Sequence, residues 1–179
     1  MTAATDPQAA LPGAIRQLGY VVTDLDEAMA SWLALGIGPW WTIREMPQTA
    51  FRHRGDPTEP VLSIAFANSG PMQLELIQQH NDAPTAYREF LDAGGRGFHH
   101  LGFWTDDFAA SAAAAEAAGL RTAQDGAGMV RFAYYELDGA TSTMLELMEL
   151  TDSTRMMDEM VSGSAAGWDG RTDPVRPLM

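Results

Sequence analysis

Two glutamates stand alone inside apolar, strand-forming segments of this chain. Glu75 lies in Met-Gln-Leu-Glu-Leu-Ile, and Glu146 lies in Met-Leu-Glu-Leu-Met. Burying an isolated carboxylate costs free energy, so a carboxylate inside a buried strand must be paired, protonated or bound to a metal ion. Either glutamate alone could be an ordinary solvated residue on a wet face of a sheet. Their matching settings favour a shared site instead.

Strand alternation adds two polar side chains to this pair. Successive side chains of a strand point to opposite faces, and the apolar face of each strand should pack under helices. Alternation therefore leaves Gln17, Glu75, His100 and Glu146 together on the opposite face. These four residues form the candidate site.

The elements that must position these residues occur twice along the chain. Hydrophobic periodicity and turn residues predict a strand, a helix and three strands, then a connecting helix, and then the same series again. The segment from Gln17 reads Gln-Leu-Gly-Tyr-Val-Val-Thr-Asp, and the segment from His100 reads His-Leu-Gly-Phe-Trp-Thr-Asp. Internal repetition of this kind predicts an α+β protein made of two βαβββ modules.

The predicted organisation has five parts. They are a flexible lead (1–13), the first module (14–80), a connecting helix and Gly-rich loop (81–97), the second module (98–150), and a C-terminal helix with an extended tail (151–179). Within the first module, the Pro-rich residues 46–60 are expected to form a loop. The C-terminal helix is expected to span residues 151–161, with Asp152 as a possible cap.

Composition excludes several kinds of chemistry. The 179 residues include 24 acidic and 11 basic side chains, for a net charge of -13; all the basic residues are Arg, and there is no Cys or Lys. Disulfides, thiolate metal sites, cysteine nucleophiles and Schiff-base lysines are therefore excluded. The acidity argues against nucleic acid or an anionic membrane as partner. We expect a cytoplasmic protein, since no signal peptide or membrane span is evident.

These motifs resemble the vicinal-oxygen-chelate superfamily, which includes glyoxalase I, methylmalonyl-CoA epimerase, extradiol dioxygenases and bleomycin-resistance proteins. The resemblance covers residues 14–150 and rests on the opening phrase from Gln17, on Gly-Phe-His-His-Leu-Gly-Phe, and on Glu146. It implies a cupped, mixed β-sheet with flanking helices around one divalent metal ion. The ligands that it implies are Gln17, Glu75, His100 and Glu146.

The ligand pattern resembles that of glyoxalase I. One imidazole and three oxygen donors suit Zn, Ni, Co or Mn, with Fe less favoured. The metal would act as a Lewis acid while a carboxylate moves a proton, with Glu146 the first choice as base and Glu75 the second. We therefore expect an isomerase or lyase acting on a small oxygenated molecule.

Five residues are candidates for substrate binding: Trp104, Arg96, His53, Trp41 and Tyr135. Arg96 matches an arginine that grips the thiol cofactor in glyoxalase I, but Val21 stands where its partner should be, which argues against glutathione. Few basic residues are available to hold the phosphates of a CoA thioester. Either Tyr134 or Tyr135 must face the site. His99 should point away from His100 by strand alternation.

Two other functions remain open. A non-catalytic ligand-binding or resistance protein could use the same fold without a metal ion. An Fe(II) dioxygenase would need two histidines and one carboxylate, and Gln17 departs from that pattern. A homodimer is the expected assembly.

Overall fold

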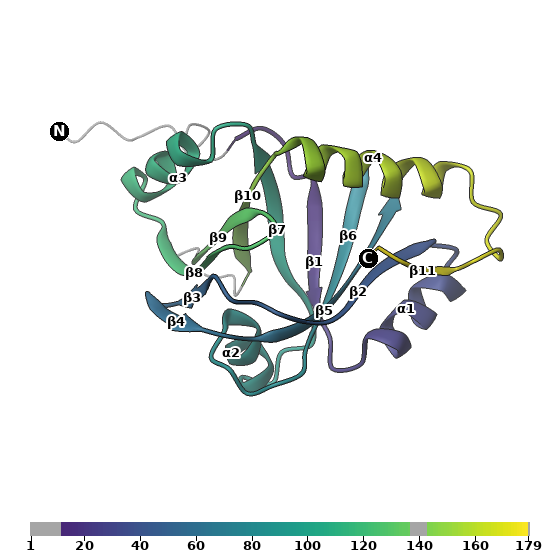
Figure 1. Cartoon of the computed structure of the whole chain (residues 1–179), viewed down its shortest axis with the longest axis horizontal. Coiled ribbons are helices and arrows are strands. Elements are labelled where there is room, and N and C mark those ends of the chain that lie inside the picture. The colour runs from purple at the N-terminus through teal and green to yellow at the C-terminus, as the bar shows by residue number, and fades with distance from the viewer. Residues whose placement is uncertain (1–11, 137–142, 179) are drawn as a thin grey trace.

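The computed structural model describes residues 12–136 and 143–178, and within them the strands form one mixed sheet (Figure 1). The strands are β1 (Gln17–Val21), β2 (Trp40–Pro47), β3 (Phe51–His53), β4 (Asp56–Thr58), β5 (Val61–Ser69), β6 (Met72–Gln79), β7 (Gly97–Thr105), β8 (Arg121–Ala127), β9 (Arg131–Glu136), β10 (Met144–Glu149) and β11 (Val175–Pro177). Their order across the sheet is β11-β2-β5-β6-β1-β7-β10-β9-β8-β3-β4. Most of the predicted lead, residues 1–11, lies outside the described residues.

The two predicted modules meet at the centre of the sheet. In each module the first strand pairs in parallel with the last: β1 with β6, and β7 with β10. The two first strands, β1 and β7, then pair with each other in antiparallel fashion. This arrangement confirms the α+β fold with two βαβββ modules, and it brings all four strands that carry candidate site residues side by side.

Each helix begins at a polar cap. The helices are α1 (Leu25–Ala34), α2 (Ala86–Asp92), α3 (Phe108–Ala117) and α4 (Asp152–Ala166). Asp24, Thr85, Asp107 and Thr151 each accept a hydrogen bond from a backbone N–H in the first turn, which satisfies a donor that the helix itself leaves unpaired. The cap of α4 is thus Thr151, not Asp152 as expected.

Helices cover both faces of the sheet. On the outer face, α1 packs over Leu74 and Leu76 of β6, and α3 packs over Leu145 and Leu147 of β10. On the inner face lie α2, through Tyr87, and α4, through Val161. Alternation along β6 and β10 therefore separates an apolar outer side from an inner side that contains the glutamates.

Within the described residues, no helix is long and apolar enough to cross a membrane.

The Pro-rich segment predicted to be a loop is instead an extension of the sheet. β2 continues to Pro47, and β3 and β4 form a hairpin closed by Arg54 and Gly55, both with positive φ. β3 pairs with β8 of the second module, and the buried Phe51 anchors it. The prolines misled the prediction because β4 is an edge strand, where a residue without an N–H is tolerated.

The C-terminal helix is longer than predicted and lies over the inner face. It continues to Ala166 because Val161 is buried against Ile43 and Phe66, which holds the middle of the helix on the sheet. The tail then returns as β11, which pairs with β2. The C-terminal segment thus forms one wall of the space beside the glutamates.

Candidate metal centre

Three side chains from three strands converge on the inner face of the sheet. Glu75 of β6, His100 of β7 and Glu146 of β10 each offer one ligand atom, and these atoms all lie within 4.8 Å of one another. Nε2 of His100 is 3.2 Å from Oε2 of Glu75 and 3.4 Å from Oε2 of Glu146. All three residues are buried. Two carboxylates and an imidazole at these separations form a compact donor set for a cation.

These donor atoms are poorly satisfied by the protein itself. Nε2 of His100 and the Oε2 atoms of Glu75 and Glu146 are buried and lack a hydrogen-bond partner among the described residues. Oε1 of Gln17 is in the same condition, while the Nε2 of Gln17 donates to Gln73 at 2.8 Å. Because buried polar groups are normally hydrogen-bonded, four such atoms on one face indicate a missing partner. Their chemistry fits a divalent metal ion.

Two glycines make room for these side chains. Gly19 lies opposite Glu75 on one side and His100 on the other, while Gly102 lies opposite Gln17 and Glu146. A Cβ added at Gly102 would lie 2.8 Å from Oε1 of Gln17, and one at Gly19 would overlap the ring of His100. The glycine in each repeated phrase therefore has a steric role. Gly19 of the first phrase makes room for His100 of the second, and Gly102 of the second makes room for Gln17 of the first.

Burial and neighbouring charges shift the pKa values of Glu75 and His100. Burial raises the pKa of Glu75 above its usual value. Burial lowers the pKa of His100, but the carboxylates of Glu146 and Glu75 outweigh this effect and raise it to about 9. Two carboxylates buried close together without a cation cost free energy. Protons bound by Glu75 or His100 reduce that cost, which is why the pKa values of both are raised.

His99 does not point away from His100. The pairing of β1 with β7 shifts register here, since Gly19 is opposite His100 and Tyr20 is opposite Phe98, which leaves His99 as the extra residue of a bulge. The bulge turns both imidazoles inward, with their Nδ1 atoms 3.1 Å apart. Burial lowers the pKa of His99 to about 3, so it is neutral. A neutral His99 can accept a hydrogen bond from Nδ1–H of His100, which leaves Nε2 of His100 free for a metal ion.

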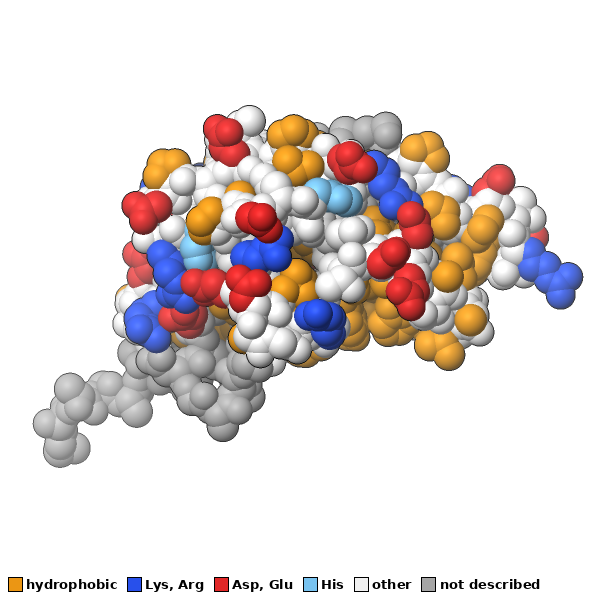
Figure 2. Space-filling model, turned by 90° about the horizontal axis from the view of Figure 1, so that it is seen from below, with side chains coloured by type: hydrophobic (Ala, Val, Ile, Leu, Met, Phe, Trp, Pro, Cys, Tyr) orange, Lys and Arg blue, Asp and Glu red, His pale blue; other side chains and the backbone are white. Residues whose placement is uncertain are grey.

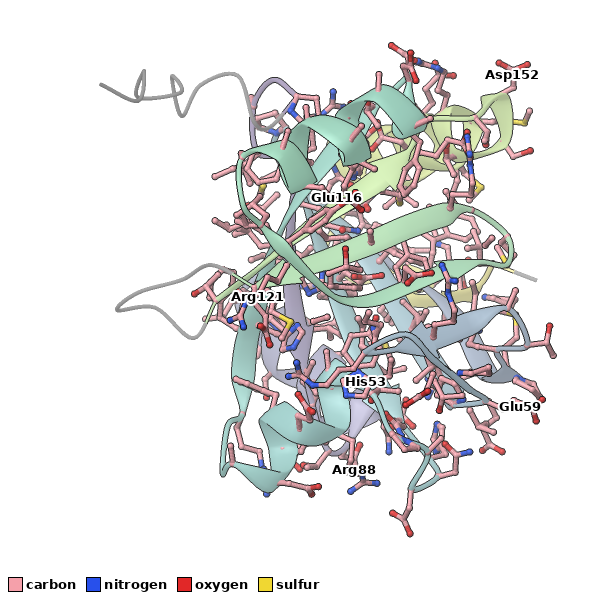
Figure 3. The ribbon with its side chains drawn as sticks, turned by 90° about the vertical axis from the view of Figure 1, so that its left-hand side faces the viewer. His53, Glu59, Arg88, Glu116, Arg121 and Asp152 are labelled. Atoms are coloured by element: carbon pink, nitrogen blue, oxygen red, sulfur yellow. The ribbon has the colours of Figure 1, made fainter. Side chains whose placement is uncertain are left out.

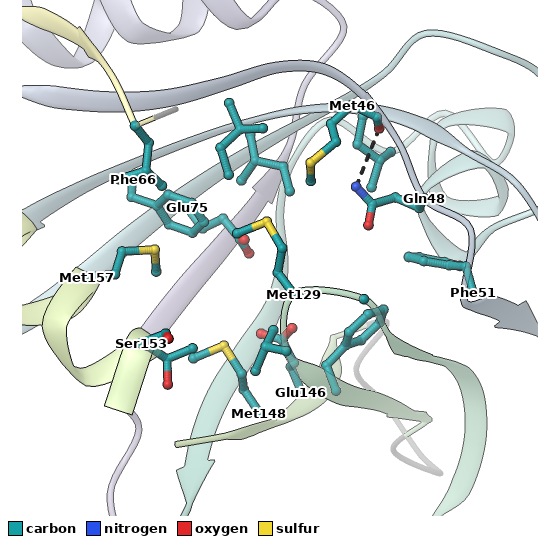
Figure 4. Close-up of a pocket in the computed structure, with 18 of the residues that line it drawn as sticks. Met46, Gln48, Phe51, Phe66, Glu75, Met129, Glu146, Met148, Ser153 and Met157 are labelled. Atoms are coloured by element: carbon teal, nitrogen blue, oxygen red, sulfur yellow. Dashed lines mark hydrogen bonds between the residues drawn. The ribbon is translucent and has the colours of Figure 1, made fainter. Parts of the chain in front are cut away.

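A cavity of about 250 Å³ opens beside the cluster, with Glu75 and Glu146 among its lining residues. Figure 4 shows both carboxylates pointing into it, with Met129 over them and Met148, Met157 and Phe66 around them. The hydroxyl of Tyr134 is bonded to that of Tyr87 at 3.1 Å, and both residues also line the cavity.

Three of the expected substrate-binding residues, Tyr135, Trp104 and Trp41, are not among the described residues that line this cavity. Tyr135 packs under α3, because its neighbour Tyr134 takes the inward position opposite Glu146. Trp104 is buried beside Met148, with Arg16 over its ring at 4.7 Å. Trp41 donates from its indole to Ser164 of α4 at 2.9 Å. The expectation for Tyr135 is corrected to Tyr134.

The other two expected residues lie elsewhere. His53 is buried in the β3–β4 hairpin, where its Nε2 lies 3.0 Å from a carboxylate oxygen of Glu89 on α2 (Figure 3). Arg96 is exposed and donates to the carbonyl of Gly95. Neither is among the described residues that line the cavity. Pairing with β8 holds the hairpin in the sheet.

Sequence reasoning missed the part of the cavity that the C-terminal segment provides. Ser153, Thr154 and Met157 of α4 and Leu178 of the tail line it. The only signal in the sequence was the helical spacing of Met156, Met157 and Met160, which shows an apolar face but not its partner.

Comparison with known families bears on this arrangement. The model of the Glyoxalase/Bleomycin resistance protein/Dioxygenase superfamily matches residues 16–134. The chain belongs to this superfamily. The match includes Gln17, Glu75 and His100, whereas Glu146 and α4 lie beyond it. A search of the curated proteins finds no match to the sequence.

Several solved structures share the fold. A hypothetical protein from Bacillus halodurans is 15% identical, with a TM-score of 0.57 over 78% of this chain and 95% of its own. Methylmalonyl-CoA epimerase from Mycobacterium tuberculosis is 20% identical, with a TM-score of 0.54 over 85% and 97%. Methylmalonyl-CoA epimerase from Streptomyces coelicolor, in complex with 2-nitronate-propionyl-CoA, is 19% identical, with a TM-score of 0.52 over 78% and 95%. At sequence identities this low, the structural similarity supports a common fold and nothing further.

Proposed function

We propose that this chain is a divalent-metal-dependent enzyme of the isomerase or lyase type, which moves a proton next to an oxygen-bearing carbon of a small molecule. The observation that carries the proposal is the buried cluster of Glu75, His100 and Glu146, whose ligand atoms lack hydrogen-bond partners among the described residues and open onto a cavity. Buried donors without a hydrogen bond of good geometry are costly to maintain, and a bound cation would offset that cost.

The donors favour a particular kind of metal. Glu75, His100 and Glu146 would hold it, and Oε1 of Gln17 would complete the set. One imidazole with oxygen donors suits Zn, Ni, Co or Mn better than soft metals, and two carboxylates balance the charge of one divalent cation. When bound, the metal supplies Lewis-acid stabilisation of negative charge that develops on a substrate oxygen.

The protein itself supplies the proton transfer. Glu146 is our first choice for the base and Glu75 the second, because both carboxylates point into the cavity where a substrate would lie. Burial, which raises the pKa of Glu75, moves that carboxyl toward the range useful for proton transfer near neutrality. The hydrogen-bonded hydroxyls of Tyr87 and Tyr134 belong to residues that line the same cavity.

The relatives and the ligand pattern support this class of reaction over the alternatives. Epimerases of this fold are isomerases, and we extend only that reaction class to this chain. An Fe(II) dioxygenase would need a second histidine ligand, but position 17 is Gln and His99 directs its Nδ1 to His100. The alternative is a protein that binds a ligand without converting it. The experiments below distinguish that function from an enzyme.

Metal content tests the site directly. Protein purified without chelator should contain about one divalent ion per chain, and Gln17→Ala and Glu146→Gln should each weaken binding, the latter by about 100-fold or more since it removes a charged ligand. Glu149→Gln is the matched control, because Glu149 lies on the same strand but pairs with Arg131. Wild-type protein without metal affinity, or equal loss in the control, would contradict the proposal.

Proton transfer needs a separate test. Once a substrate is found, incubation in heavy water should introduce deuterium at a single carbon of recovered substrate or product, and Glu146→Gln should suppress it. Metal and ligand binding without any deuterium incorporation would instead indicate a binding protein.

We further propose that the chain forms a homodimer. Met156 and Met160 of α4 are exposed apolar side chains on the outside of the C-terminal wall. Light scattering coupled to gel filtration would measure the mass in solution, and a monomer at micromolar concentration would contradict this proposal.

A further inference from the structure

The cavity beside the glutamates is apolar over most of its surface. Its walls are built from aromatic and thioether side chains, including Phe51, Phe66, Phe132, Met129, Met148 and Met157. Met side chains adapt to irregular apolar ligands, and aromatic rings supply large contact areas. Such walls favour a ligand whose body is apolar.

Cations are missing from the described lining of the cavity. The chain has no Lys, and all eleven Arg residues lie in the described part. Eight of them form ion pairs with carboxylates within that part, and the remaining three are Arg96, Arg171 and Arg176. Figure 2 shows basic side chains lying next to acidic ones on one face. Phosphate or carboxylate groups of a carrier such as CoA or glutathione would find no counter-charge in this cavity.

The charged groups of the described lining are gathered at one end. Glu75 and Glu146 lie at the floor, and the Tyr134 hydroxyl beside them is already bonded to Tyr87. Away from the floor, Gln48 is placed between β2 and the β8–β9 turn, where its amide makes one long bond of 3.4 Å to the carbonyl of Met46 (Figure 4). An oxygen-bearing end of a ligand would therefore lie at the floor and an apolar body above it.

The C-terminal segment limits the size of the ligand. Met157 of α4 and Leu178 of the tail close one side of the cavity, which holds about 250 Å³. An apolar cavity of about 150 Å³ accommodates benzene, and sites for drug-sized ligands begin near about 300 Å³. The space suits a single substituted ring or an aliphatic molecule of similar size.

We infer that the substrate is an uncharged, mainly apolar molecule of about one substituted ring, with an oxygen-bearing end directed at Glu75 and Glu146 and no phosphate- or carboxylate-bearing carrier. The position of the oxygen end rests on the proposed function. The inference of an apolar, uncharged body depends only on the residues that line the cavity. The two parts of the inference, the oxygen end and the apolar body, can therefore fail separately.

Two probes that differ by one charge test this inference. We would titrate 2-hydroxyacetophenone and its ring-sulfonated counterpart into zinc-loaded and zinc-free protein, and follow binding by calorimetry. The neutral probe should bind at least about tenfold more tightly than the sulfonate in both forms, because the cavity gives a buried sulfonate no partner. Zinc should strengthen binding of the neutral probe.

A positive charge placed in the lining away from the glutamates should weaken this selectivity. Gln48→Arg adds a cation at a lining position away from the glutamates and should reduce the tenfold preference to less than about threefold by pairing with the sulfonate. Leu35→Arg is the matched control, since it adds the same charge at the end of α1, at a position that is 73% exposed and outside the described lining. It should leave the preference unchanged.

The outcomes separate the two proposals. Equal or tighter binding of the sulfonate to the wild type, a preference that Gln48→Arg does not change, or binding of neither probe at millimolar concentration would overturn the inference. Failure of zinc to bind, with the neutral preference and its response to Gln48→Arg intact, would overturn the metal-dependent function and leave the apolar ligand class standing.

Discussion

Gly19 of β1 lies directly opposite His100 of β7, and the imidazole of His100 occupies the space that a Cβ at residue 19 would need. The relationship is reciprocal, since Gly102 of β7 lies opposite Gln17 of β1. Each candidate ligand at the start of a repeated phrase thus lies over the glycine of the other phrase. The site is built at the contact between the two modules, where neither module alone could complete it.

Replacing this glycine should damage the site more than the fold. Gly19→Ala forces the ring of His100 away from Glu75 and Glu146, so we expect metal affinity to fall by at least about tenfold. Overpacking of this kind also lowers the free energy of unfolding by about 1–3 kcal/mol. Zinc titration and urea denaturation would measure the two effects.

The control for this substitution is Gly163→Ala. Gly163 lies within α4, and a Cβ there would meet nothing within 4 Å among the described residues. Alanine favours a helix over glycine, so this variant should be more stable by about 0.5–1 kcal/mol and bind metal normally. A Gly19→Ala protein with unchanged metal affinity would show that His100 is not positioned by this contact.

His99 should influence metal binding through its neighbour. His99→Gln removes the Nδ1 that meets Nδ1 of His100 and leaves no acceptor at the same distance along the side chain, so we expect about tenfold weaker metal binding, as for other groups that orient a ligand. His80→Gln provides a comparison, because Nε2 of His80 bonds Ser63 at 2.8 Å away from the cluster. Equal metal affinity in wild type and His99→Gln would leave His99 with a packing role alone.

Binding of the metal should stabilise the folded protein. A ligand at about 100 times its dissociation constant adds about 2.7 kcal/mol, which corresponds to an increase of roughly 5–10 °C in Tm for a chain of this size. Differential scanning calorimetry with zinc, cobalt and chelator would measure it. The increase should disappear in Glu146→Gln, whereas an equal increase in that variant would place the bound ion elsewhere.

Period-two alternation was sufficient to find the donor set. Glu75 and Glu146 are polar residues in otherwise apolar strands, and their apolar neighbours pack outward under α1 and α3 as predicted. The repeated phrase from Gln17 and from His100 indicated the two modules. These signals are local, so a single sequence contains them.

Features that depend on contacts between distant segments could not be predicted in this way. The bulge at His99 exists because β1 and β7 meet out of register, and alternation within β7 alone gives the wrong direction for that side chain. The inward side chain of β9 is Tyr134 because of its pairing with Glu146 of β10. The position of α4 over the inner face depends on tertiary packing, which the spacing of its Met residues does not specify.

The hairpin network should contribute a pH dependence of its own. Hydrogen bonds from Arg54 and from His53 lower the pKa of Glu89 to about 2, against an ordinary value of 4.5. A carboxylate with a lowered pKa in the folded state stabilises the protein above pH 4.5, and this contribution is lost as the pH falls from 4.5 towards 2. Glu89→Gln should therefore lower the free energy of unfolding at pH 5.5 more than at pH 3, as measured by urea denaturation at both values. Glu116→Gln, an exposed glutamate on α3 (Figure 3), should show a much smaller difference between the two pH values. Equal pH dependence in the two variants would show that the contacts of Arg54 and His53 with Glu89 do not persist in solution.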